Sequence, residues 1–345
     1  MSTTTTLSYA EIEALAAKAL TASGVSPANA GPVARSIAAA ERDGQPIVGL
    51  SYLPVYCDHA ACGKVDGHAT PRIETLSPVA IRVDAMTGFA HPAIALGMPD
   101  LIAASRQSGL AALSVGNSYA CGSLGFFVEA LADKGLVALM AANASPSIAP
   151  FGGKTPFFGT NPLAFAVPRK GRAPLVIDQS SSVVARVAVI DAHRRGVPLP
   201  DGWAIDSEGV PTNDAAAAMQ GSLLPIGGYK GFWLALMVDI LAAGLTRSHW
   251  SFEASSFGDC EGGPPKTGQF IMALDPALFG GDAFGARLEK MLAAALETPK
   301  VRLPGDRRLS AREKRDRGIA VPTAVVETVR RYAAEGSPEL RKAKD

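Results

Sequence analysis

Three short polar loops contain residue types that could bind a small ligand. Residues 117–122 (NSYACG) join an expected strand to an expected helix, where free backbone N–H groups favour an anion such as a phosphate. Residues 159–162 (GTNP) open a strand with hydrogen-bonding side chains. Residues 178–182 (DQSSS) follow a hydrophobic strand, at a point where polar groups often line a pocket. Each pattern is also typical of an ordinary turn or helix cap, so the loops by themselves define no activity.

The sequence lacks the common nucleotide, hydrolase and zinc motifs. No G-x-G-x-x-G run follows an expected strand, which excludes the Rossmann fingerprint. Residues 153–155 (GKT) match the end of a P-loop, but Ile148 stands where a P-loop has glycine and Pro156 would disturb the next helix. G-x-S-x-G and H-E-x-x-H motifs are also missing. Because Cys57 and Cys62 lack zinc-knuckle spacing, we expect no metal site and interpret the four cysteines as buried or incidental thiols.

Composition narrows the class of protein. The 345 residues include 33 Lys and Arg against 32 Asp and Glu, so the net charge of +1 gives no electrostatic reason to bind nucleic acid or an anionic membrane. The longest apolar run, residues 231–245, is interrupted by Asp239 and is shorter than the roughly 20 residues that a membrane span requires. The first residues carry no basic or apolar signal region, and we therefore expect a cytoplasmic protein.

Helical patterns at both ends of the chain flank a region of alternating strands and helices. A capping box at Ser8 begins the first helix, and the alternation of residues 79–84 indicates the first strand. Further strands are expected at 110–115, 136–141, 163–167, 175–177 and 268–274, with helices at 92–108, 123–134 and 230–245. We predict a helical N-terminal segment (1–77) that packs with a C-terminal helical segment (277–345), and a central α/β domain (78–276) between them.

Eight stretches, in order along nearly the whole chain, carry a resemblance to a known family. They are AERDG (40–44), GKV (63–65), FGTNP (158–162), DQSSSVVAR (178–186), PDGWAID (200–206), GGYKG (227–231), DIL (239–241) and RLPG (302–305). On these stretches the sequence resembles the malate/L-lactate dehydrogenase family, which is unrelated to the Rossmann-type enzymes. That family also contains ureidoglycolate, sulfolactate and diketogulonate oxidoreductases and Δ1-pyrroline-2-carboxylate/Δ1-piperideine-2-carboxylate reductases.

The resemblance implies a helical domain and a central, largely antiparallel sheet that binds NADPH or NADH in a non-Rossmann manner, usually in a homodimer. Domain 78–276 would then be the cofactor-binding domain. The cofactor-binding residues implied in this sequence are Tyr119, Ala120, Cys121, Gly122, Asp178, Gln179, Ser180, Lys230, Pro304, Gly305, Asp306, Arg307 and Arg308. Val48, Tyr52 and Thr160 are the implied substrate-binding residues. Arg307 and Arg308 suit the 2′-phosphate of NADPH, although a solvated surface charge is an equal interpretation of each.

The family's usual proton donor is missing from this sequence. Members normally have Ser-His-Gly shortly after the Asp-Gly that matches residues 43–44, and the His gives a proton to the substrate oxygen or nitrogen. Here Ile47 and Val48 stand at the Ser and His positions, and neither side chain can carry a proton. Tyr52 replaces an Arg that would pair with the substrate carboxylate, and Ala120 replaces a second usual His.

The missing acid favours one class of substrate. Hydride addition to a ketone generates an alkoxide, and a positioned general acid typically contributes about 10²–10⁴-fold to such a reaction. A cyclic imine arrives protonated on nitrogen, so its reduction creates no anion. We therefore expect an NAD(P)H-dependent reductase that converts Δ1-pyrroline-2-carboxylate or Δ1-piperideine-2-carboxylate to L-proline or L-pipecolate.

Two alternatives remain open at this point. The protein could be a malate/lactate-type 2-hydroxy acid dehydrogenase in which Tyr52, His91 or Tyr119 replaces the catalytic proton donor, although a histidine such as His91 at a helix start is also typical of a packing residue. It could also be a catalytically silent protein that retains the cofactor loops. In every case the expected partner is a small molecule, a cyclic imino acid or a 2-oxo acid, together with a second copy of the chain.

Overall fold

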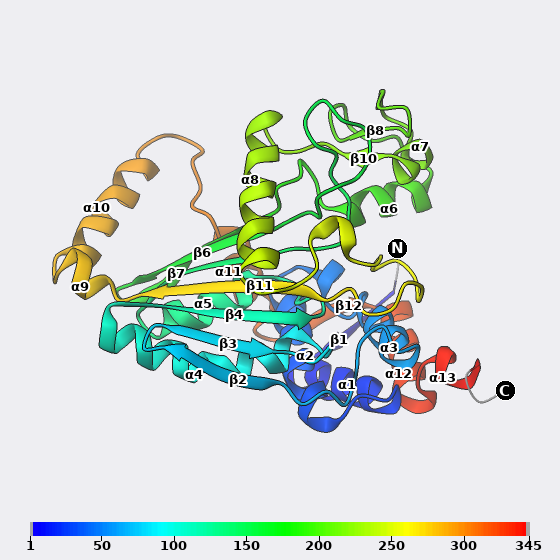
Figure 1. Cartoon of the computed structure of the whole chain (residues 1–345), viewed down its shortest axis with the longest axis horizontal. Coiled ribbons are helices and arrows are strands. Elements are labelled where there is room, and N and C mark those ends of the chain that lie inside the picture. The colour runs from blue at the N-terminus through cyan, green and yellow to red at the C-terminus, as the bar shows by residue number, and fades with distance from the viewer. Residues whose placement is uncertain (1–2, 343–345) are drawn as a thin grey trace.

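A seven-stranded sheet forms the centre of the molecule, which we describe from a computed structural model over residues 3–342 (Figure 1). The strand order is β2-β3-β4-β11-β5-β6-β7. All neighbouring pairs are antiparallel except β3 and β4. The bounds are β2 Arg72–Ser77, β3 Ala80–Asp84, β4 Leu110–Ser118, β11 Thr267–Leu274, β5 Val137–Ala142, β6 Leu163–Arg169 and β7 Arg172–Gln179. The predicted α/β class with a largely antiparallel sheet is therefore confirmed.

The strand directions bring the predicted ligand loops to one edge of this sheet. β4 and β5 both pair antiparallel with β11, so they run the same way, and β7 shares that direction because β6 lies antiparallel between β5 and β7. The segments after β4 and β7 and the segment before β6 consequently meet at the same edge. These are the three polar loops that the sequence analysis singled out.

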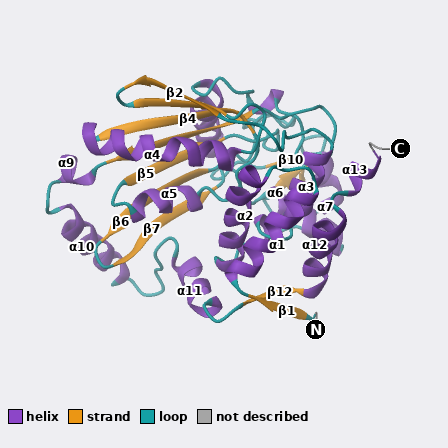
Figure 2. Ribbon diagram, turned by 90° about the horizontal axis from the view of Figure 1, so that it is seen from below, coloured by secondary structure: helices purple, strands orange, loops and turns teal. Residues whose placement is uncertain are grey.

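Two helices cover one face of the sheet (Figure 2). They are α4 (Ala90–Ser108) and α5 (Gly125–Asp133), and both begin close to the predicted cofactor turn. Alternate residues of β3 and β4, such as Val83, Leu113 and Val115, are fully buried beneath them. This packing anchors the start of each helix relative to the sheet edge.

A helical unit joins the two ends of the chain. It contains β1 (Thr4–Leu7), α1 (Tyr9–Ala22), α2 (Pro27–Arg42), the short helix η1 (Pro46–Val48), α3 (Leu53–Ala61), β12 (Ile319–Pro322), α12 (Thr323–Glu335) and α13 (Pro338–Lys342). The capping box at Ser8 is present as predicted, with Glu11 as its second member. β1 pairs with β12, and α1, α2, α3 and α12 share one core.

The structure differs from the predicted segment boundaries in three places. β2 lies inside the predicted helical segment 1–77. It was not predicted from the sequence because this edge strand is almost wholly exposed and has no apolar alternation. In 277–345, α9 (Pro276–Gly280) and α10 (Phe284–Leu296) lie at the far end of the sheet, and only the region from α11 (Asp306–Arg315) onward approaches the helical unit (Figure 1). The predicted helix 230–245 divides into α8 (Tyr229–Asp239) and the π-helical η2 (Ile240–Gly244).

A third, smaller unit was not expected within 78–276. It consists of α6 (Arg186–Arg195), β8 (Ala204–Ile205), β9 (Pro211–Thr212), α7 (Ala215–Gln220) and β10 (Ser222–Leu223), with α8 packed beside it. Its strands form the sheet β10-β8-β9 over a separate core. Within residues 3–342, no helix combines the length and apolar character that crossing a membrane demands.

Candidate functional site

The turn after β4 and the end of β7 are joined through the carboxylate of Asp178. Its Oδ2 accepts hydrogen bonds from the backbone N–H of Gly125 (2.8 Å) and from the hydroxyl of Ser123 (2.9 Å). Gly125 is the first residue of α5. The side chain of Asp178, near the end of β7, therefore caps this helix. Burial raises the pKa of Asp178, while these two hydrogen bonds and the nearby charge of Arg308 act in the opposite direction. The backbone just after the predicted cofactor turn is thus fixed by a charged group.

The other two polar loops also lie together. The backbone N–H of Ser181 donates to the carbonyl oxygen of Thr160 (2.8 Å), and its hydroxyl donates to the carbonyl of Asn161 (2.7 Å). The fully buried Asn161 side chain donates in turn to the carbonyl of Ala235 on α8 (2.9 Å). Loops 159–162 and 178–182 are therefore held against the helix whose first turn contains Lys230.

The ring of Tyr56 brings the three candidate proton donors into one cluster. Its centroid lies 4.9 Å from that of Tyr52, 6.2 Å from that of His91 and 5.9 Å from that of Tyr119. A Cβ atom built on Gly122 would lie 3.6 Å from the Tyr56 hydroxyl, so this hydroxyl borders the predicted cofactor turn. The structure thus gathers residues from α3, α4 and the turn after β4, which the sequence could connect only by resemblance.

Burial governs the protonation of all three candidates. It raises the pKa of Tyr52 to about 12 and that of Tyr119 well above its usual range. It lowers the pKa of His91 to about 3, an effect that the backbone of Cys121 partly opposes. At neutral pH the imidazole is uncharged and both phenols keep their protons. None of the three is a strong acid under those conditions.

Tyr119 has a polar partner that the sequence did not suggest. His59 on α3 is 3% exposed, and its Nδ1 meets the hydroxyl of Tyr119 in a hydrogen bond. Burial and the neighbouring Lys64 ammonium lower the pKa of His59. The ring of Phe257 packs edge-on against Tyr119 with centroids 5.1 Å apart. Tyr119 is therefore held by one hydrogen bond and a shell of aromatic rings.

The two adjacent arginines of the 304–308 loop have different environments. Arg308 is buried and forms a bidentate pair with Glu129 of α5, at 2.9 and 3.1 Å. Arg312 contacts the same carboxylate and also Asp43, whose Oδ1 lies 2.6 Å from its Nε. This four-residue ionic cluster ties α11 to α5 and to the end of α2. Arg308 is occupied by protein carboxylates.

Arg307, by contrast, is exposed. It lines a groove of about 460 Å³ together with Arg302, Lys314 and Arg315. The preceding Gly305, at φ +89°, brings the loop against β7, where an added Cβ would meet the carbonyl of Val176 at 3.4 Å. The groove is strongly basic and lies beside the loop that the resemblance assigns to the cofactor.

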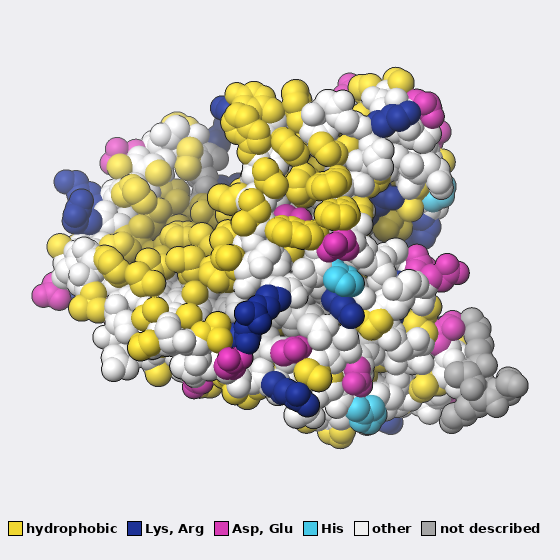
Figure 3. All heavy atoms as spheres, in the orientation of Figure 1, with side chains coloured by type: hydrophobic (Ala, Val, Ile, Leu, Met, Phe, Trp, Pro, Cys, Tyr) yellow, Lys and Arg dark blue, Asp and Glu magenta, His cyan; other side chains and the backbone are white. Residues whose placement is uncertain are grey.

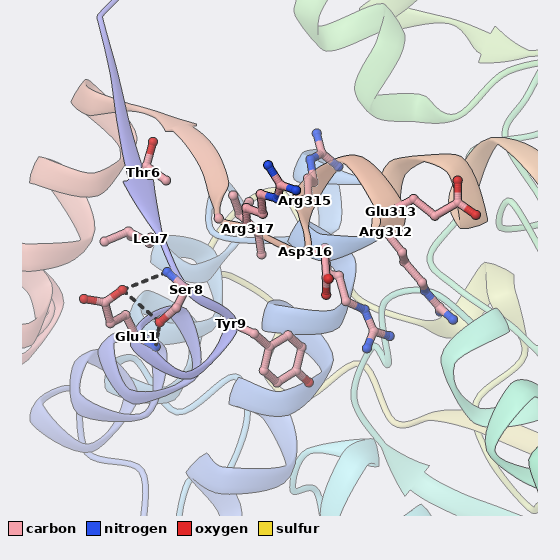
Figure 4. A pocket seen from close by; sticks show the side chains of 13 residues that line it. Thr6, Leu7, Ser8, Tyr9, Glu11, Arg312, Glu313, Arg315, Asp316 and Arg317 are labelled. Atoms are coloured by element: carbon pink, nitrogen blue, oxygen red, sulfur yellow. Dashed lines mark hydrogen bonds between the residues drawn. The ribbon is translucent and has the colours of Figure 1, made fainter.

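Three other predicted residues are wholly or partly exposed. Lys230 is exposed at the start of α8, Thr160 is half-buried in its loop, and Val48 is half-buried at the end of η1. A separate hollow of about 650 Å³ opens between the start of α1 and the end of α11 (Figure 4). There Glu11 turns back to Ser8, and no predicted site residue lines the hollow. We therefore place the candidate site at the sheet edge.

Comparison with known proteins agrees with the fold. Residues 7–330 match the sequence profile described as malate/L-lactate dehydrogenase. The chain belongs to this malate/L-lactate dehydrogenase family. It is accordingly an NAD(P)-dependent oxidoreductase, as the family and its named relatives are.

Relatives within the family differ in their substrates. The chain is 48% identical to a (2R)-3-sulfolactate dehydrogenase (NADP(+)) of Chromohalobacter salexigens, covering 95% of this chain and 98% of the relative. It is 38% identical to a Δ1-pyrroline-2-carboxylate reductase of Ancylobacter novellus, covering 96% and 98%. Among solved structures, the Δ1-piperideine-2-carboxylate reductase of Pseudomonas syringae pv. tomato superposes with a TM-score of 0.91 at 38% identity, over 95% of this chain and 99% of that one.

The prediction that all four cysteines are buried or incidental thiols is wrong for two of them. Cys57 and Cys121 are buried free thiols, as expected, but Cys62 and Cys260 form a disulfide across 198 residues. His59 and Lys64 were not predicted as site residues, and their partners are distant in the chain. Two local signals were their grouping within residues 57–64 with two cysteines and the position of Lys64 in the GKV stretch (63–65) that carries the family resemblance.

Proposed function

We propose that the chain reduces a cyclic 2-imino carboxylate, Δ1-pyrroline-2-carboxylate or Δ1-piperideine-2-carboxylate, with NADPH. One observation carries the proposal: Tyr52, His91 and Tyr119 hold no readily released proton at neutral pH. The nicotinamide cofactor supplies the hydride. A protonated imine accepts that hydride at carbon and becomes an amine without any proton from the protein. The similarity to a Δ1-pyrroline-2-carboxylate reductase at 38% identity supports this choice.

The residues present suit a dinucleotide phosphate. Lys230, in the first turn of α8, and Arg307, in the basic groove, are exposed cations, and cations of this kind bind phosphate oxygens. Arg308 would act indirectly, because it is paired with Glu129 and can only fix the position of α11 relative to α5. Aromatic packing around Tyr56 and Tyr119 would exclude water from the neighbouring substrate.

A second candidate function rests on the relative at 48% identity, which is named as a sulfolactate dehydrogenase. In this alternative the substrate is a 2-oxo or 2-hydroxy acid, and the carbonyl oxygen must receive a proton. Tyr119 is then the best placed donor, because its hydroxyl is hydrogen-bonded to His59 and a histidine can return a proton to the phenol. The two functions therefore differ in whether Tyr119 is needed.

The deciding experiment measures NADPH and NADH oxidation with Δ1-pyrroline-2-carboxylate, pyruvate, oxaloacetate and 3-sulfopyruvate. Turnover of the imine alone supports the first proposal, and turnover of the oxo acids alone contradicts it. Tyr52→Phe, Tyr119→Phe and His91→Gln should each leave imine reduction within about tenfold of the wild type, since the substrate brings its own proton. Tyr9→Phe, a phenol outside the site that bonds to the carbonyl of Arg35, is the matched control. Cofactor binding without any turnover would indicate a silent binding protein.

We also propose that the protein is a homodimer. Hydrophobic side chains gather over α8 and its surroundings (Figure 3), including Trp233, which is 60% exposed, and Met237, Ile240 and Phe252, each about half exposed. Contiguous apolar surface of this kind usually marks a protein interface. Light scattering after size exclusion should give twice the chain mass of 35.6 kDa. Trp233→Glu should shift the protein toward the monomer.

A further inference from the structure

The disulfide between Cys62 and Cys260 lies directly against the aromatic side of the candidate site. Cys62 is the residue that ends α3, one turn after His59, and Cys260 belongs to an irregular stretch that we call the clasp loop, residues 254–263. Their Cα atoms are 6.2 Å apart, within the range that a disulfide spans. The bond therefore connects the helical unit to the segment that leads into β11.

Other contacts seat the clasp loop on the same surface. The ammonium of Lys64, whose side chain is fully buried, donates to the carbonyl of Glu261 (2.5 Å) and lies 3.3 Å from the carboxylate of Asp259. Phe257 packs on the ring of Tyr119. His59, hydrogen-bonded to Tyr119, also contacts the backbone of Asp259. The position of the loop is thus coupled to Tyr119 through two independent side chains.

The four cysteines fall into two chemical classes. Cys57 and Cys121 are buried, and burial raises the pKa of each thiol to about 12, which keeps them protonated and unreactive. Cys62 and Cys260 are only half-buried, so a small thiol or disulfide can reach them. Bonds of this accessible kind in a cytoplasmic protein are typically transient and redox-sensing. The cytoplasmic location itself is the prediction made from the sequence.

We propose that Cys62 and Cys260 form a reversible redox clasp that controls how firmly the clasp loop holds Tyr119 in the cofactor-binding turn. The proposal rests on the proposed function in one respect, since it takes Tyr119 to border the bound cofactor. With the bond closed, the loop is held covalently on α3. With the bond open, only the non-covalent contacts of Lys64, His59 and Phe257 described above hold the loop, and Tyr119 and His59 gain freedom to move.

The chemistry is thiol–disulfide exchange with a small disulfide such as oxidised glutathione. One cysteine, as its thiolate, attacks a sulfur of the small disulfide, forms a mixed disulfide and releases one thiolate. The other cysteine, also as a thiolate, attacks the protein sulfur of that mixed disulfide, closes the Cys62–Cys260 bond and releases the second thiolate. The two protein thiols lose two electrons and two protons, and the small disulfide becomes two thiols. An excess of reduced glutathione reverses both steps.

The test compares the full-length wild type in oxidised and in reduced glutathione buffers by three measurements. Thiol titration after denaturation should find two thiols in the oxidised protein and four in the reduced protein. Hydrogen exchange over residues 254–263 should be faster in the reduced protein. NADPH affinity, measured by fluorescence titration without substrate, should be at least about fivefold weaker in the reduced protein, the lower end of typical coupling between sites.

The double variant Cys62→Ser, Cys260→Ser is the matched control. It should resemble the reduced wild type in exchange and NADPH affinity, and it should ignore the buffer change. Four thiols in both buffers would overturn the proposal, and so would a bond that opens without changing exchange or NADPH affinity. The wild-type comparison decides the matter even where the double variant folds poorly. Failure of the proposed function is separately visible as absent imine turnover, or absent NADPH binding, while thiol titration and exchange still report on the clasp.

Discussion

On one side of the candidate site, charged groups and hydrogen bonds hold the backbone, whereas on the other side aromatic rings pack on one another. The first side, which we call the cofactor side, comprises the loops 117–125, 159–162 and 178–182 with α8 and α11. Its main stabilising contacts are those of Asp178 and of the Arg308–Glu129 pair. The second, the proton side, comprises η1, α3 and the start of α4, centred on Tyr56.

The difference predicts where residue replacements are tolerated. A buried carboxylate or guanidinium must keep its partners, because an unpaired buried charge is costly. Ring packing tolerates replacement provided that volume and apolar character are preserved. Val48 and Tyr52, at two positions where the resemblance implies a replaced polar residue, lie on the proton side, whereas Ala120, at a third such position, belongs to loop 117–125 of the cofactor side.

The sharpest way to break the comparison is to remove a charge from the cofactor side. Glu129→Ala leaves the buried Arg308 and the half-buried Arg312 without their shared carboxylate, so we expect the free energy of unfolding to fall by about 3 kcal/mol or more. Urea denaturation measures this change. Glu208→Ala removes the exposed partner of Lys154 and should cost less than about 0.5 kcal/mol. Equal losses in the two variants would mean that the ionic cluster does not hold this side together.

A pH series tests the proton side. The folded protein leaves His91 uncharged down to a pKa of about 3, while an unfolded chain binds that proton near pH 6.5. Below pH 6.5 the unfolded state therefore binds more protons than the folded state. The free energy of unfolding consequently decreases as the pH is lowered. Between pH 6.5 and 5 this histidine should cost the wild type about 2 kcal/mol of unfolding free energy.

His91→Phe keeps a ring against Tyr56 and Phe127 and removes the titrating group. Its unfolding free energy should consequently depend less on pH over the same interval, by about 2 kcal/mol. His68→Phe, at an exposed position, is the control. A wild-type acid dependence that His91→Phe leaves unchanged would contradict the assignment of His91 as a buried neutral residue.

Local patterns in the sequence were sufficient to predict much of the fold. Apolar alternation located β3, short apolar segments located β4, β5, β6, β7 and β11, and the capping box located the start of α1. The three polar loops were correctly recognised as strand-end segments, and strand direction then brings them together. β2 escaped because burial, which produces the alternation, is absent from that strand.

Long-range partners could not be predicted in this way. Nothing in the adjacent pair Arg307 and Arg308 indicates which guanidinium turns inward, because the choice depends on Glu129, which lies 179 residues from Arg308. His59 meets Tyr119 across 60 residues, and Cys62 meets Cys260 across 198. Such pairs leave no periodicity in the chain and become visible only when packing brings them into contact.

The exposed member of that arginine pair supplies the finest test of the cofactor side. Arg307→Gln should weaken NADPH binding about tenfold, equivalent to about 1.4 kcal/mol, if its charge meets the 2′-phosphate. NADH lacks that phosphate. The affinity for NADH should therefore change by less than about twofold, because an exposed charge without a direct partner contributes little. Arg330→Gln, an exposed arginine on α12, is the matched control. An equal loss of affinity for both cofactors would assign Arg307 to the pyrophosphate that they share. No loss of affinity for either cofactor would mean that Arg307 is a solvated charge. The cofactor side would then depend on its buried charges alone.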